Sequence, residues 1–87
     1  MCREKSLLLF FLLTARDIDA EFVEGYIIPP DDNLMYGHTW VKVNDYNMSF
    51  LADPTHNIFV PYDSDFAKEH YLESGMLILR NNNSNNL

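Results

Sequence analysis

The alternation of apolar and polar positions predicts one helix followed by several strands. Residues 3–16 contain no glycine or proline, and every position from Leu7 to Leu13 is apolar. Because a helix that is apolar all round is usually buried, we expect a helix over 3–16 that is buried on most sides. Residues 20–28 mix β-branched, aromatic and polar side chains, which is typical of a strand. Pro29 and Pro30 end this strand because proline cannot donate to a β-ladder.

A second and a third strand are expected to form an antiparallel hairpin. In 38–43 the period of two places Thr39, Val41 and Val43 on one face and His38, Trp40 and Lys42 on the other. Turn-forming residues at 44–47 separate this segment from a third strand over 48–53. A turn at that place predicts that His38 lies directly opposite Asp53, with Trp40 opposite Leu51 and Lys42 opposite Ser49.

The remaining pattern is weaker. Ser64 or Asp63 is expected to cap a short helix over 65–72, and residues 76–79 predict a closing strand. The Asn-rich end, 81–87, has no apolar period and is expected to be a disordered tail after a single domain at 1–80. The predicted fold class is α+β, with one buried N-terminal helix packed on a small antiparallel sheet.

Composition narrows the possible partners. The chain of 87 residues is 47% hydrophobic and carries a net charge of −7, so a folded domain is expected and binding to nucleic acid is not. The longest apolar run is far shorter than the ~20 residues that cross a bilayer, so no membrane partner is expected. Cys2 is the only cysteine, which excludes an internal disulfide and a multi-cysteine zinc site.

Three chemically active side chains fit a nucleophile, base and orienting group. Cys2 precedes the expected helix, where free backbone N–H groups favour a thiolate. His38 opens the second strand and is placed to accept the thiol proton. Asp53 ends the partner strand of the hairpin, where its carboxylate is expected to fix the tautomer of the imidazole. The spacing therefore points to Cys2, His38 and Asp53 as a catalytic triad.

Four sequence blocks, in order, resemble the transglutaminase-like superfamily of cysteine enzymes. Cys2–Ser6 and the apolar helix after it are similar to the nucleophile helix of that family. Ala20–Tyr26 resembles its Ala-Arg-x-Val-x-Gly-Tyr strand, Gly37–Val43 its His-x-Trp-Val-x-Val strand, and Asp53-Pro54-Thr55 its Asp-Pro-Thr. The resemblance implies a papain-like fold with Cys2 as nucleophile, His38 as base and Asp53 as orienting residue. It also implies acyl transfer on peptide or protein amide bonds through a thioester, with release to water or to an amine.

The chain departs from the family pattern at several points. Glu21 replaces the family arginine, Asp17 stands where a glycine often ends the helix, and Met48-Ser49-Phe50 lacks the tryptophan common before Asp-Pro-Thr. The family also carries a segment before its cysteine that helps to form the oxyanion hole, and this sequence has only Met1 there. The alternative is a truncated, inactive transglutaminase-like fold that serves as an interaction module or remnant. If Met1 is removed, the amino group of Cys2 becomes a second candidate base.

Four further residues have simpler expected roles. Trp40 and Tyr26 are expected in the core or as walls of a substrate cleft. His56 and His70 are expected to be ordinary surface or loop residues, and a zinc site at His38, Asp53 and His56 is an alternative that the residue types allow.

The acyl-transfer chemistry requires no cofactor, and a reduced thiol favours the cytoplasm. A secreted protein is the alternative, if residues 1–20 act as a signal peptide: Arg3 and Lys5 precede the apolar run, and small residues follow near Ala20.

Overall fold

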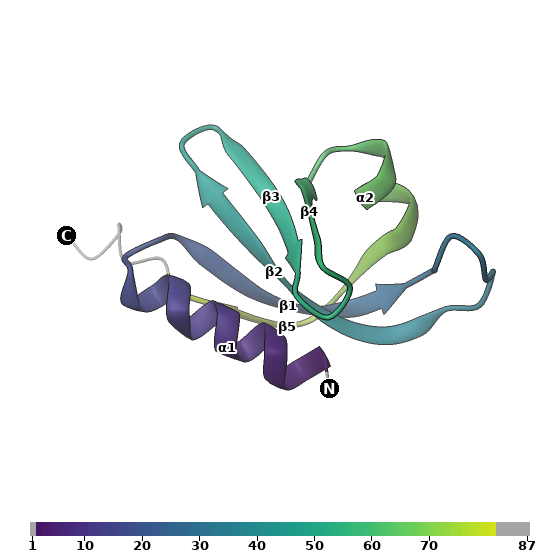
Figure 1. Cartoon of the computed structure of the whole chain (residues 1–87), viewed down its shortest axis with the longest axis horizontal. Helices are drawn as coiled ribbons and strands as arrows, with labels where there is room; N and C mark the ends of the chain where they lie inside the picture. Colours follow the sequence, from purple (N-terminus) through teal and green to yellow (C-terminus); the bar gives the residue numbers. More distant parts are fainter. Residues whose placement is uncertain (1, 82–87) are drawn as a thin grey trace.

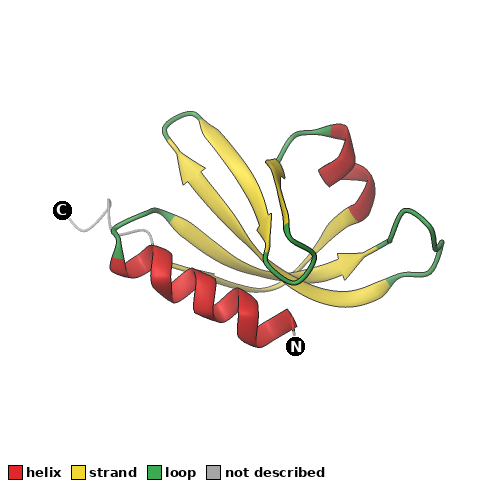
Figure 2. Ribbon diagram, in the orientation of Figure 1, coloured by secondary structure: helices red, strands yellow, loops and turns green. Residues whose placement is uncertain are grey.

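The fold is an N-terminal helix packed on one face of a five-stranded antiparallel sheet (Figures 1 and 2). A computed structural model describes residues 2–81, without the side chains of Met76 and Leu77. In chain order its elements are α1 (Cys2–Ala15), β1 (Ala20–Ile27), β2 (Tyr36–Asp45), β3 (Met48–Asp53), β4 (Ile58–Pro61), α2 (Asp65–His70) and β5 (Tyr71–Arg80). The strand order is β4-β3-β2-β1-β5. The predicted α+β class is confirmed; no helix in the described part is long and apolar enough to span a bilayer.

The sheet separates two apolar clusters, because successive side chains of a strand point to opposite faces. On one face Phe10 of α1 packs against Phe22, Val41 and Ala52. On the other face a second cluster lies beneath α2, and Ile58 and Val60 of β4 pack against it. Its buried members are Val23, Ile27, Trp40, Leu51 and Ala67. Figure 1 shows α1 along one side of the sheet and α2 on the opposite side, next to the edge strand β4.

Helix α1 is buried on one side only, so the prediction of a helix buried on most sides is wrong. Its buried residues are Ser6 and Phe10. Leu8, Phe11 and Leu12 face outward with 61%, 58% and 56% of their surface exposed. The apolar run fixes helix formation and burial of one face. Among the described residues, no second layer of the protein covers the other face of the helix.

The hairpin of β2 and β3 has a register two residues away from the predicted one. Asp45 pairs with Met48 and Val41 with Ala52, so the turn is confined to Tyr46 and Asn47. Tyr46 has a φ of 54°, a left-handed conformation that a tight turn requires. His38 is therefore not directly opposite Asp53. Because the side-chain period of a strand is two, this shift leaves both residues on the expected face.

The C-terminal half is more ordered than its weak pattern predicts. Strand β4 pairs with β3 and was not predicted, and β5 is longer than the expected strand at 76–79. Ser64 caps α2 as expected, since its side chain accepts the backbone N–H of Ala67. Asn81 does not belong to a tail: its side chain accepts from the N–H of Ala20 and donates to the carbonyl of Ile18. Met1 and the rest of the predicted tail, 82–87, lie outside the described residues.

Gly25 on β1 provides a direct test of the packing between β1, β2 and β5. A Cβ at this position would overlap the carbonyl oxygen of Leu72 and would lie 2.7 Å from the Trp40 ring. Gly25→Ala is therefore expected to lower the free energy of unfolding by about 1–3 kcal/mol through overpacking. Gly37→Ala is the matched control, because a Cβ there has no neighbour within 4 Å. Urea unfolding followed by circular dichroism measures both; equal losses would contradict the described packing.

Candidate active site

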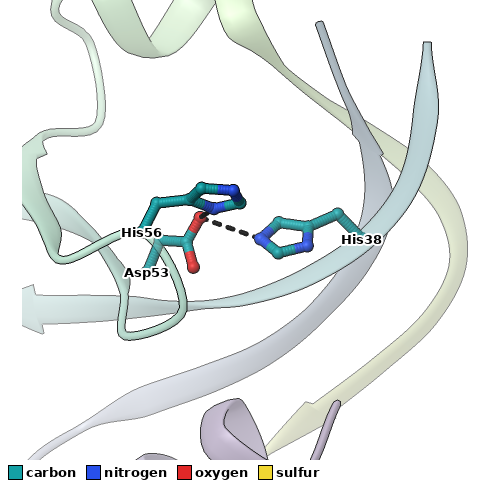
Figure 3. A group of neighbouring side chains, drawn as sticks. All are labelled: His38, Asp53 and His56. Atoms are coloured by element: carbon teal, nitrogen blue, oxygen red, sulfur yellow. Dashed lines mark hydrogen bonds and ion pairs between the residues drawn. The ribbon is translucent and has the colours of Figure 1, made fainter. Parts of the chain in front are cut away.

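Three side chains converge on one carboxylate oxygen at the end of β3. Nε2 of His38 lies 2.8 Å, Nδ1 of His56 2.9 Å and the hydroxyl of Tyr71 2.6 Å from Oδ2 of Asp53. The backbone N–H of Thr55 donates to Oδ1 at 3.1 Å. Figure 3 shows both imidazoles directed at the Asp53 carboxylate. The side chains of Asp53 and His38 are 0% and 3% exposed, whereas that of His56 is 45% exposed. The site is therefore buried at its centre and open to solvent on the His56 side.

Four segments of the chain position these groups. His38 lies near the start of β2, and its even position places it on the sheet face that carries Trp40, away from α1. Asp53 ends β3 on the same face, two residues before the position that would face His38 directly, so the two side chains meet diagonally. His56 lies in the turn between β3 and β4. Tyr71 is the first residue of β5, directly after α2.

Asp53 is held in its ionised form by these contacts. Burial acts to raise the pKa of the carboxyl group, but hydrogen bonds from His38, Tyr71 and His56 outweigh it and lower the pKa to about 2. The same arrangement raises the pKa of Tyr71, first because the phenol is buried and second because it donates to Asp53. Tyr71 is therefore a neutral hydrogen-bond donor at neutral pH.

The ionised carboxylate fixes the tautomer of each imidazole. A carboxylate only accepts hydrogen bonds, so Nε2 of His38 and Nδ1 of His56 must each carry the proton that faces Asp53. A neutral His38 ring then has its lone pair on Nδ1. This is the tautomer in which the other nitrogen can accept a proton from a nucleophile, as in a nucleophile–base–orienter arrangement.

Cys2 approaches the same end of β2 from the other side of the sheet. It is the first residue of α1 and is partly buried. One helical turn further on, the hydroxyl of Ser6 donates to the backbone carbonyl of Thr39 at 3.0 Å, so the first turn of α1 lies beside the residue that follows His38. No hydrogen bond joins Cys2 to His38 in the described part of the chain. The structure thus brings His38 and Asp53 into contact and places Cys2 at the start of α1.

The two residues expected in a cleft lie on opposite faces of the sheet. Trp40 is fully buried beneath α2, and its Nε1–H donates to the hydroxyl of Tyr62 at 3.0 Å. Tyr26 is 42% exposed. It follows Phe22 by four residues on β1 and therefore lies on the same face of the sheet, the one that carries α1. Trp40 is therefore a core residue that supports the His38 side of the sheet.

The expectation that His56 and His70 are ordinary surface or loop residues holds only in part, since His56 does lie in an exposed turn but both histidines have specific partners. His56 binds Asp53, and half-buried His70 lies with its Nδ1 2.6 Å from the carbonyl oxygen of Ile28. His56 follows Asp53 by three residues, and a turn after Asp-Pro-Thr is a local signal that points to this contact. Tyr71 gives no such signal. Its contact with Asp53 depends on the pairing of β5 with β1, which a local pattern does not specify.

Comparison with known proteins does not identify a family. The chain matches no protein-family model, no curated protein and no solved structure. The resemblance to transglutaminase-like enzymes therefore rests on the four sequence blocks alone.

The low pKa of Asp53 predicts a specific loss of stability in acid. A carboxyl group whose pKa falls from 3.8 to about 2 on folding stabilises the folded state above its unfolded pKa. This contribution is lost as the pH falls from about 4 towards about 2. Asp53→Asn is therefore expected to flatten the decline in unfolding free energy across this range. Urea unfolding at several pH values measures the slope. Asp63→Asn, at an exposed loop position, is the control, and equal slopes for the two variants would contradict the assignment.

Proposed function

We propose that this chain performs cysteine-dependent acyl transfer on amide bonds, with Cys2 as nucleophile, His38 as base and Asp53 as orienting residue. The observation that carries the proposal is the buried contact of 2.8 Å between His38 and Asp53, which joins two strands at positions fifteen residues apart in the chain. The transglutaminase-like sequence blocks supply the nucleophile and the class of substrate, which is a peptide or protein amide. A papain-like arrangement of helix and sheet belongs to the same proposal.

The reaction follows from the roles of the three side chains. Nδ1 of His38 takes the proton of the Cys2 thiol, and the thiolate forms a C–S bond with the amide carbonyl carbon. As the tetrahedral intermediate collapses, the C–N bond breaks and His38 returns the proton to the leaving nitrogen. Water or an amine then attacks the thioester with His38 as base, the C–S bond breaks, and the Cys2 thiol is restored. Asp53 stays ionised throughout and stabilises the imidazolium.

The first turn of α1 supports the nucleophile role of Cys2. The N–H groups at the start of a helix have no partners within the helix, and together with the helix dipole they favour an anion. They also supply donors for a developing oxyanion. The hydrogen bond from Ser6 to the carbonyl of Thr39 anchors this turn to β2 beside His38. Reaction requires the Cys2 thiol and the His38 ring to come into contact around the start of β2, and the reactivity of Cys2 depends on this contact.

Alkylation of Cys2 by iodoacetamide at about pH 6 measures thiolate activation directly. A free thiol at this pH is almost entirely protonated, so coupling to His38 is expected to raise the alkylation rate at least about tenfold over that of an unstructured cysteine peptide. His38→Ala is expected to abolish this excess, and Asp53→Asn is expected to reduce it because the ring loses its fixed tautomer. Mass spectrometry of the intact chain gives the rates.

The control for this experiment is His70→Ala, which removes a histidine outside the site and is expected to leave the rate unchanged. Circular dichroism confirms that each variant is folded before its rate is compared. An alkylation rate for the unmodified chain equal to that of the peptide, or one that His38→Ala leaves unaltered, contradicts the proposal.

An interaction module without turnover is the second candidate function. It is favoured by the placement of α1 on the sheet face away from His38 and by the outward-facing Leu8, Phe11 and Leu12. A row of exposed apolar side chains on a helix is typical of a surface that contacts another protein. The alkylation series separates the two candidates, since an interaction module requires no dependence of Cys2 on His38.

A further inference from the structure

The side chains around Asp53 form a donor set typical of a transition-metal site. His38, Asp53 and His56 each present one ligand atom, and these three atoms all lie within 4.8 Å of one another. Two imidazole nitrogens and one carboxylate oxygen are the ligands that zinc and related divalent ions take in open, three-residue sites. The centroids of the two imidazole rings are 5.0 Å apart, and one nitrogen of each ring is directed at the same carboxylate oxygen (Figure 3).

The distances need little adjustment to accept an ion. Zinc bonds of about 2.0–2.2 Å in a tetrahedral arrangement hold adjacent ligand atoms about 3.3–3.5 Å apart. The nitrogens of His38 and His56 are 2.8 Å and 2.9 Å from Oδ2 of Asp53, so each has to move outward by only about 0.5 Å. Each ring must also carry its proton on the nitrogen that faces away from Asp53, because a metal-bound imidazole nitrogen has no proton.

The charge of the site favours a cation. Asp53 is buried, and among the described residues its ion-pair partners are the two histidines, with no lysine or arginine in contact. A buried carboxylate without a permanent positive partner is costly, and a divalent ion supplies that charge. The net charge of −7 on the chain adds a long-range attraction for cations.

We propose that His38, Asp53 and His56 form a zinc-binding site with an open fourth coordination position. His38 binds through Nε2, His56 through Nδ1 and Asp53 through Oδ2. Neither Cys2 nor acyl transfer is needed for this site, so it stands apart from the function proposed above.

Groups behind the ligands hold the carboxylate in place. The N–H of Thr55 donates to Oδ1, which leaves Oδ2 as the oxygen directed at the two imidazoles. The hydroxyl of Tyr71 donates to Oδ2 at 2.6 Å and keeps it oriented. The half-exposed ring of His56 lines a small cavity of about 60 Å³ together with His70, Tyr71 and apolar side chains, so the site is open on the His56 side.

The ligand types set the choice of metal. Two nitrogen ligands favour zinc, cobalt or copper, whereas calcium and magnesium take sites built almost entirely from oxygen. Magnesium and calcium are therefore expected not to compete at this site, which supplies an internal test of selectivity.

Titration of the full chain with Co²⁺ and Zn²⁺, after treatment with a chelator, tests the site. Co²⁺ is expected to bind with the visible absorption of a four-coordinate site, Zn²⁺ is expected to displace it, and excess Mg²⁺ is expected to leave the spectrum unchanged. His56→Ala is expected to weaken Zn²⁺ binding at least about tenfold, and Tyr71→Phe about tenfold or more through loss of carboxylate orientation. Calorimetry gives the affinities.

Two control variants exclude other metal sites, and both are expected to bind Zn²⁺ like the unmodified chain. Cys2→Ser removes the thiol, and Asp63→Asn removes an exposed loop carboxylate outside the cluster. His56 is half exposed, so His56→Ala is expected to remain folded even if substitution of buried His38 prevents folding. Absence of Zn²⁺ binding, binding that His56→Ala leaves unchanged, or binding that only Cys2→Ser removes overturns the proposal. When the alkylation rates are measured in the presence of a chelator, none of these results bears on the acyl-transfer proposal, which has its own test.

Discussion

The buried carboxylate of Asp53 is the interaction on which the candidate site depends. An ionised group without water is stable only where hydrogen bonds replace its hydration, and here His38, His56, Tyr71 and the backbone of Thr55 supply them. These donors come from β2, from the turn after β3 and from the start of β5. Asp53 therefore ties together segments that would otherwise be joined only through the sheet, and it places two imidazoles within a few ångströms of each other.

The sheet gives the molecule two different surfaces. One face receives α1, which begins at Cys2, while the other carries α2 and the Asp53 cluster. Acyl transfer requires the Cys2 thiol and the His38 ring to come into contact around the start of β2, whereas zinc binding uses only the face that carries Asp53. The two uses of His38 are mutually exclusive, since a ring with zinc on Nε2 keeps its proton on Nδ1 and cannot accept one from a thiol. If both proposals hold, zinc is an inhibitor of the acyl-transfer chemistry.

Local patterns were sufficient for part of this arrangement. The period of two in 38–43 predicts that His38 and Trp40 share one face of the sheet. The contact between His38 and Asp53 is also predicted correctly although the register differs by two residues, because a shift of two residues leaves each side chain on the same face. The one-sided exposure of α1 was not predictable, since seven consecutive apolar residues do not show which side a sheet will cover. The position of Tyr71 depends on the pairing of β5 with β1, and the position of β4 depends on its pairing with β3. The four sequence blocks end before β4 and β5, so they do not predict either pairing.

The central claim is that Asp53 orients both imidazoles through protons on the nitrogens that face it. Nitrogen-15 NMR of the histidine rings in the metal-free chain measures this directly, because the two ring nitrogens differ in chemical shift according to which one is protonated. The account predicts a proton on Nε2 of His38 and on Nδ1 of His56, with both ring signals changed in Asp53→Asn. A His38 ring protonated only on Nδ1, or ring signals that are unchanged in Asp53→Asn, would contradict it.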